Sequence, residues 1–117
     1  VEAYAAAQTS GDVDAVVALV APDAVVADPV HEPAHVGREA SHTFFSGTRD
    51  MVDSMVVAVT GPIRAVERYA AVPLRAVSDI GGSRVAVDIV DVFTFEDNGL
   101  IGDMKAYWDP AGITPVD

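Results

Sequence analysis

The chain has 117 residues, of which 50% are hydrophobic and 21% charged, so we expect one folded domain over residues 1–117 with a single core. The net charge of −11, with only seven Lys and Arg, excludes nucleic acid and anionic membrane surfaces as expected partners. The absence of cysteine excludes disulfides and thiolate chemistry. We see no signal segment and no apolar run long enough to cross a membrane, so a cytoplasmic location is the default expectation.

The first part of the chain is expected to form three helices and a short strand. Residues 1–9 are rich in alanine and favour a helix. Because the chain starts inside this helix and without Met, we expect that some N-terminal residues are missing. Valines at helical spacing over residues 13–20 predict a second helix that ends at Pro22. Residues 24–28 are typical of a strand, and residues 38–46 of a third helix.

The remainder of the chain is typical of strands. Residues 79–82 and 96–99 each contain glycine next to aspartate or asparagine and predict hairpin turns. The expected strands, rich in β-branched and aromatic residues, are 55–66, 68–77, 84–95 and 101–108. This order predicts an α+β fold, a curved antiparallel sheet with three N-terminal helices that enclose an apolar pocket. Such a pocket suits a small apolar ligand.

One motif resembles a zinc site. His31-Glu32-Pro33-Ala34-His35 matches H-E-x-x-H, which binds zinc when a helix brings both imidazoles to one face. Pro33 disfavours the helical conformation for Glu32, and only His42 is a nearby third ligand. We therefore expect a polar loop and no metal.

Two acids lie where apolar residues are expected. Asp28 shares the strand face of Ala24 and Val26, although on its own it could simply begin an Asp-Pro turn. Asp91 interrupts an apolar face within residues 84–95. Desolvation there would raise its pKa and favour the neutral acid, which can donate a hydrogen bond. The alternative for Asp91 is a buried acid whose hydrogen bonds only satisfy a neighbouring helix.

Taken in order along the chain, these features resemble the ketosteroid isomerase family of the NTF2-like, SnoaL-like superfamily. The resemblance extends from Tyr4 to about Ile113 and begins with Tyr4, Gly11-Asp12 and Asp28-Pro29. It continues in the segments TGPIRA (60–65), DIVDVFTF (88–95) and MKAYW (104–108). The family implies an NTF2-like cone, a homodimer formed through the sheet, and no cofactor.

The resemblance also implies roles for individual residues. Asp28 would be the general base, and Tyr4 and a protonated Asp91 would form the oxyanion hole; ketosteroid isomerase is the established example of a carboxylic acid kept neutral for this purpose. The substrate would be a steroid-like apolar molecule, a 3-oxo-Δ5-steroid converted to the conjugated 3-oxo-Δ4-steroid through a dienolate. The residues that match the substrate-binding wall are Trp108, Met104, Phe93 and Phe45.

The sequence departs from the family at two positions and leaves other functions open. Branches of the family have a tyrosine where this chain has Phe45 or Val20, so Tyr4 is expected to lack its usual supporting hydrogen bonds. A non-catalytic ligand-binding domain is one alternative. Another is a cyclase or dehydratase on the same fold; dehydratases pair His with Asp, and the candidate histidines are His31, His35 and His42. No arginine is clearly placed for the Asp-Arg-Asp arrangement of the epoxide hydrolases.

Overall fold

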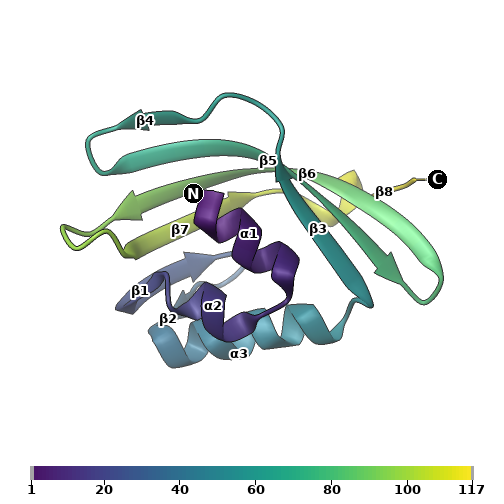
Figure 1. Ribbon diagram of the computed structural model, residues 1–117, viewed down its shortest axis with the longest axis horizontal. Coiled ribbons are helices and arrows are strands. Elements are labelled where there is room, and N and C mark those ends of the chain that lie inside the picture. Colours follow the sequence, from purple (N-terminus) through teal and green to yellow (C-terminus); the bar gives the residue numbers. More distant parts are fainter. Residues whose placement is uncertain (1, 117) are drawn as a thin grey trace.

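The computed structural model describes residues 2–116 and confirms the α+β class (Figure 1). Three helices lie on one side of a strongly curved sheet. The helices are α1 (Glu2–Ser10), α2 (Val13–Val17) and α3 (Arg38–Asp50), and a short 3-10 helix, η1, covers Pro110–Gly112. The strands are β1 (Val20–Ala27), β2 (His35–Val36), β3 (Ser54–Val59), β4 (Arg64–Val66), β5 (Tyr69–Ile80), β6 (Ser83–Phe95), β7 (Ile101–Tyr107) and β8 (Thr114–Pro115).

The sheet is mixed, whereas a purely antiparallel sheet was expected. Its strand order is β2-β1-β7-β6-β5-β3, with β4 added to β5 and β8 added to β6. The exception is β1, which pairs with β7 in parallel, while the other pairs are antiparallel. A parallel pair needs a long connection, and β1 and β7 are separated by most of the chain. This pairing places the end of β1 beside the end of β7.

The second helix is shorter than expected, and the first strand begins earlier. The helix ends at Val17, and β1 starts at Val20 and contains Pro22. Val20 pairs with Ile101, and the register of β1 against β7 shifts between Val20 and Val25. This irregularity accommodates the proline, which cannot donate to a regular ladder. Valine suits helix and strand patterns alike, so its spacing alone did not locate the boundary.

Two other boundaries also differ from expectation. The helix α3 continues through Gly47 to Asp50, because an exposed glycine inside a helix costs only about 1 kcal/mol. The strand expected over residues 55–66 is divided into β3 and β4 by a segment that contains Gly61-Pro62. Both hairpin turns are confirmed, since Gly81, Gly82 and Gly99 adopt positive φ angles that glycine tolerates best.

The main core lies between the helices and the inner face of the sheet. Phe93, Leu74 and Met104 are its largest fully buried side chains, and Tyr4 and Phe45 bring α1 and α3 against them. Among residues 2–116, no helix is long and apolar enough to cross a membrane. The helices and the curved sheet therefore bury one apolar layer, and part of that layer remains open as a cavity.

Candidate active site

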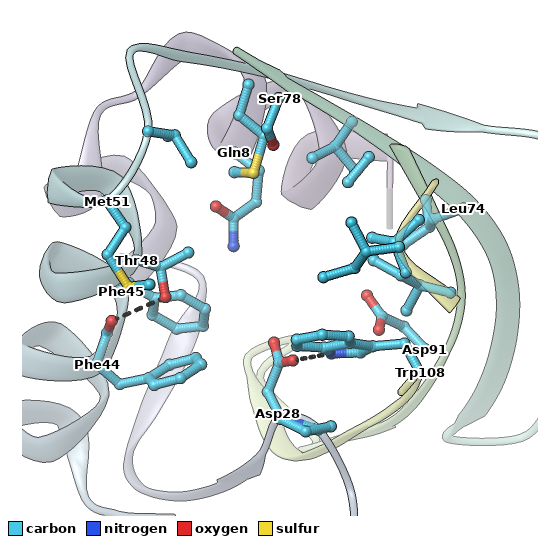
Figure 2. Close-up of a pocket in the computed structure, with 18 of the residues that line it drawn as sticks. Gln8, Asp28, Phe44, Phe45, Thr48, Met51, Leu74, Ser78, Asp91 and Trp108 are labelled. Atoms are coloured by element: carbon cyan, nitrogen blue, oxygen red, sulfur yellow. Dashed lines mark hydrogen bonds between the residues drawn. The ribbon is translucent and has the colours of Figure 1, made fainter. Parts of the chain in front are cut away.

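A cavity of about 630 Å³ opens between the helices and the inner face of the sheet (Figure 2). Figure 2 shows Phe44 and Phe45 of α3, and Met51 directly after it, on one side, opposite Leu74 of β5. Most of the remaining wall is also apolar, and the volume is typical of sites for small molecules. The polar side chains that line it include Tyr4, Gln8, Asp28, Asp91 and Trp108.

Asp91 lies on the inner face of β6 and is only 3% exposed. Burial, together with the nearby charge of Asp28, raises its pKa to about 8. No group among the described residues forms a hydrogen bond with its carboxyl, which lines the cavity. At neutral pH the protonated form therefore predominates, and its O–H is available to a ligand.

Asp28 follows β1 directly and lies at the same end of the cavity as Asp91 (Figure 2). Burial raises its pKa, whereas the hydrogen bond from Trp108 and the proximity of His35 lower it. In that bond the Trp108 Nε1–H donates to Asp28 Oδ1 over 2.6 Å. The indole thereby fixes one carboxylate oxygen and leaves the other to face the cavity. Trp108 was expected only as an apolar wall, so this donor role is an addition.

Tyr4 reaches the cavity from α1 and is 4% exposed. Burial raises its pKa well above the ordinary value, and the charges of Asp91 and Asp28 raise it further. The Gln8 Nε2–H donates to Tyr4 Oη over 2.9 Å, which lowers the pKa in part. The tyrosine therefore stays protonated. The ring packs edge-on against Phe93, with centroids 5.3 Å apart.

Gln8 is a polar residue of the cavity that was not predicted from the sequence. It lies four residues after Tyr4, so both side chains share one face of α1. The four-residue spacing of Tyr4 and Gln8 is the feature of the sequence from which their contact could have been predicted. Because Phe45 and Val20 stand where the family has supporting tyrosines, Tyr4 was expected to lack its usual hydrogen bonds, and the bond from Gln8 supplies one.

The structure divides the four expected wall residues into two pairs. Trp108 and Phe45 line the cavity, as expected. Phe93 and Met104 do not line it; they are directly paired across β6 and β7 and are 0% and 1% exposed. Because Tyr4 packs over Phe93, these two side chains support the cavity wall from behind and are not available to touch a ligand.

The three histidines have different surroundings. Residues 28–34 form turns and bends instead of a helix, so the H-E-x-x-H segment does not present a helical face. Within residues 2–116, no group of three potential ligand side chains is close enough to hold a metal. His31 is exposed and outside the cavity. His35 lines the cavity near Asp28 and stacks on Phe44, with centroids 4.4 Å apart.

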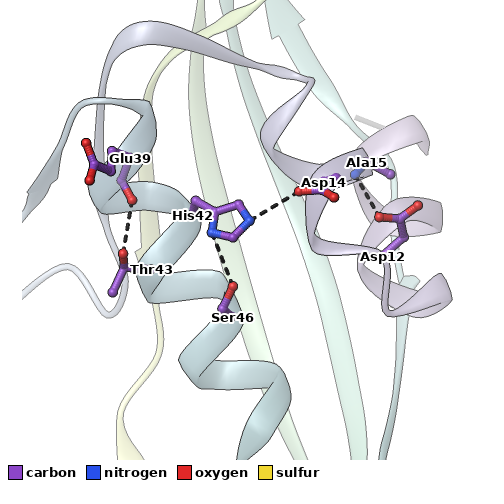
Figure 3. Close-up of polar contacts among 7 residues, drawn as sticks. All are labelled: Asp12, Asp14, Ala15, Glu39, His42, Thr43 and Ser46. Atoms are coloured by element: carbon purple, nitrogen blue, oxygen red, sulfur yellow. Dashed lines mark hydrogen bonds and ion pairs between the residues drawn. The ribbon is translucent and has the colours of Figure 1, made fainter.

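His42 lies outside the cavity, in a polar cluster that joins α2 and α3 (Figure 3). Its Nε2 is 3.2 Å from Asp14 Oδ1, and its Nδ1 is 3.4 Å from Ser46 Oγ. The pair is well exposed, with side-chain exposures of 47% for His42 and 88% for Asp14. These contacts connect two helices at the surface, so His42 is not the partner of Asp28.

Comparison with known proteins shows to which family the chain belongs. Residues 1–104 match the SnoaL-like domain. The chain is 34% identical to a protein described as steroid Delta-isomerase from Nocardioides simplex, over 97% of this chain and 91% of that protein.

Two solved structures are also similar to the chain. One is SalBIII, described as an epoxide hydrolase/cyclase-like enzyme in pyran ring formation in the polyether salinomycin, with TM-score 0.86, 28% identity and coverage of 97% and 90% of the two chains. The other is RV0760c from Mycobacterium tuberculosis, with TM-score 0.88, 24% identity and coverage of 98% and 92%, which shows a common fold. The chain belongs to the SnoaL-like family of NTF2-like proteins.

Proposed function

We propose that the protein is a steroid Δ-isomerase that converts 3-oxo-Δ5-steroids into conjugated 3-oxo-Δ4-steroids. The observation that carries the proposal is the convergence of Tyr4, Asp28 and Asp91 on one apolar cavity, with the two carboxyls in different environments. The 34% identity to a steroid Delta-isomerase over nearly the whole chain supports it.

The proposed reaction transfers one proton within the substrate. The Asp28 carboxylate takes a proton from the carbon between the carbonyl and the double bond, and the electron pair of that C–H bond delocalises onto the carbonyl oxygen. The resulting dienolate accepts hydrogen bonds from Tyr4 Oη–H and from the protonated Asp91. Asp28 then returns the proton to the far carbon of the former double bond, which gives the conjugated enone. Every atom is conserved, and the scheme uses no metal or cofactor.

The surroundings of the three groups suit these roles. Two preformed donors in a largely apolar cavity stabilise a developing oxyanion more strongly than bulk water does. Asp91 is raised to a pKa of about 8 and so remains a donor at neutral pH. Asp28 has the Trp108 indole N–H to stabilise its charged form, so it can act as the base. Different environments thus give two aspartates opposite tasks.

The test is a kinetic comparison of the protein with its Asp28→Asn variant. Mixing with a 5-ene-3-oxosteroid should produce the ultraviolet absorbance of a conjugated enone, and the variant should lose this activity by about 100-fold or more. Trp108 is the only tryptophan and lies in the cavity, so its fluorescence reports ligand binding in both proteins. Binding without turnover in the wild-type protein would support a non-catalytic ligand-binding domain instead.

A cyclase or dehydratase is the second candidate, and one observation favours it. His35 lines the same cavity and lies near enough to Asp28 to lower its pKa, so the two could act as an acid–base pair. The similarity to SalBIII is consistent with this alternative. The His35→Phe variant retains an aromatic ring to stack on Phe44 and separates the two candidates. The isomerase should tolerate it within about threefold, whereas a reaction that needs the imidazole would lose about 100-fold.

A further inference from the structure

The Gln8 side chain is a buried amide for which the proposed reaction has no direct use. It is 8% exposed, lies one turn after Tyr4 on α1, and reaches into the cavity (Figure 2). Its Nε2–H donates to Tyr4 Oη, and this is the one hydrogen bond to that hydroxyl among residues 2–116. Phe45, which also lines the cavity, has no polar atom to contribute. Among the described residues, the amide is therefore the only group that orients the Tyr4 hydroxyl by a hydrogen bond.

The direction of this hydrogen bond decides what the tyrosine can do. A phenolic hydroxyl has one proton and can also accept hydrogen bonds. Because Tyr4 accepts from Gln8, its own proton remains free for an acceptor in the cavity. If a hydrogen-bond acceptor replaced the Gln8 amide, the Tyr4 hydroxyl would donate its proton to that acceptor. The ligand oxygen would then receive no hydrogen bond from Tyr4.

The backbone holds Gln8 firmly. Its carbonyl oxygen accepts from Gly11 N over 3.3 Å and from Arg49 Nη1 over 3.5 Å. The next residue, Thr9, both donates to and accepts from the backbone of Val57 on β3. These bonds fix the last turn of α1 against α3 and the sheet, so the amide does not need to be positioned by the ligand.

We propose that Gln8 is a positioning residue that directs the Tyr4 hydroxyl proton into the cavity, toward an enolate-like or phenolic oxygen of the ligand. The inference rests on the proposed function for the identity of that oxygen. The neutral amide supports the tyrosine without adding a charge to the cavity. It thus takes the place of the tyrosine that the resemblance implied at Phe45 or Val20.

Binding of 2-naphthol, compared with naphthalene, tests the proposal without turnover. The phenolic oxygen of 2-naphthol stands in for the enolate oxygen, and naphthalene reports the apolar wall alone. Equilibrium dialysis would give the ratio of the two affinities for the wild-type protein and for Gln8→Met and Gln8→Glu. Methionine retains the length of the side chain without the donor, and glutamate is nearly isosteric with glutamine but can only accept once its carboxyl is ionised.

The proposal predicts that the ratio falls by about threefold in Gln8→Met and, at a pH high enough to ionise the introduced carboxyl, by about tenfold in Gln8→Glu, amounts typical of one hydrogen bond. In the isomerase assay both variants should lower kcat with KM nearly unchanged. An unchanged affinity ratio in both variants would show that Gln8 only packs in the cavity and does not position the Tyr4 hydroxyl, so the proposal would be wrong. A higher ratio in Gln8→Met would show that the amide oxygen takes the Tyr4 proton, which would overturn the proposal.

The outcomes also distinguish this inference from the proposed function. If the naphthol ratios change as expected but no steroid is isomerised, Gln8 positions Tyr4 for another oxygen ligand, and the isomerase proposal fails. If steroid turnover is fast and the ratios do not change, the isomerase proposal stands and the role of Gln8 is wrong. The midpoint of urea unfolding, measured for each variant, confirms that the compared proteins are folded.

Discussion

Asp28 and Asp91 are both removed from bulk water, yet their neighbours differ. Asp28 has a donor, the Trp108 indole, that stabilises its ionised form. Asp91 has no such donor among the described residues, and the charge of Asp28 disfavours its ionisation. A shift of one pKa unit corresponds to about 1.4 kcal/mol, so the raised pKa of Asp91 reflects a large preference for the neutral acid. Asp28 is thus stabilised as the carboxylate, which can accept a proton. Asp91 is favoured as the neutral acid, which can donate a hydrogen bond.

The pH dependence of kcat/KM should report both acids. Asp28 acts as a base only when ionised, so activity should decrease as the pH falls through its raised pKa. Asp91 donates only when protonated, so activity should also decrease as the pH rises through about 8. Steady-state rates of enone formation between pH 4 and pH 10 would measure both limbs.

The Asp91→Asn variant is the matched control for the alkaline limb. Asparagine is nearly isosteric and can still donate a hydrogen bond, but it does not titrate. We expect activity about 10-fold or more below the wild-type protein, because the amide is a weaker donor, and no decrease near pH 8. An alkaline limb that persists unchanged in this variant would assign it to another group.

At the scale of elements, the position of Tyr4 depends on how α1 is fixed to the edge of the sheet. Thr9 Oγ1 donates to Val57 O over 3.1 Å and accepts from Val57 N over 2.9 Å. Val57 lies on β3, whose other side pairs with β5. One hydroxyl thus satisfies both polar groups of an edge-strand residue and joins α1 to it.

Replacing Thr9 by valine should remove both hydrogen bonds while retaining the shape of the side chain. We expect the free energy of unfolding to fall by about 1–2 kcal/mol, measured by urea denaturation. Thr43→Val is the matched control, because the exposed Thr43 hydroxyl bonds only to the Glu39 carbonyl within its own helix. A similar loss in both variants would mean that the Thr9 bonds to β3 contribute little.

The sequence predicted the order and type of most elements, and local chemistry explains why. The two hairpins depend on glycines in turns, and these were located correctly. The parallel pairing of β1 with β7 could not be predicted, because it is a contact between segments far apart in the chain. The end of the second helix was missed because valine periodicity does not distinguish a helix from the start of a strand.

The site, like the fold, was predicted in part, and the features that were missed depend on contacts between distant segments. The resemblance placed Tyr4, Asp28 and Asp91 on one cavity, and the structure brings them together there. Strand alternation assigned Phe93 and Met104 to the correct face but did not reveal that Tyr4 covers Phe93. The depth of a side chain beneath a packed helix is a tertiary property that alternation does not encode.

At the scale of the whole molecule, the outer face of the sheet has an apolar strip. Val90 of β6 lies directly opposite Tyr107 of β7, and the two are 43% and 50% exposed. Both point outward, because their neighbours Asp91 and Ala106 are paired and buried on the inner face. Pro73 of β5, paired with Val90, extends the strip. We propose that this strip forms the contact of the expected homodimer.

The dimer proposal predicts twice the mass of one chain in light scattering coupled to size-exclusion chromatography. Val90→Asp should shift the protein toward the monomer, because it places a charge in the apolar contact of a chain that is already strongly acidic. Val36→Asp is the control, since Val36 is 66% exposed on the edge strand β2, which β1 separates from β7. A wild-type monomer at high concentration would contradict the proposal.

The transfer of an isotopic label tests the central claim, proton transfer by one base, most directly. A 5-ene-3-oxosteroid whose carbon between the carbonyl and the double bond carries one deuterium, at the position from which the base removes the proton, would be converted by the wild-type protein in ordinary water, and the product analysed by mass spectrometry. We expect a substantial part of the deuterium in the product, because the largely buried Asp28 returns the deuteron that it removed. Complete replacement by solvent hydrogen would contradict the single shuttling base, and the absence of any conjugated product would contradict the isomerase itself.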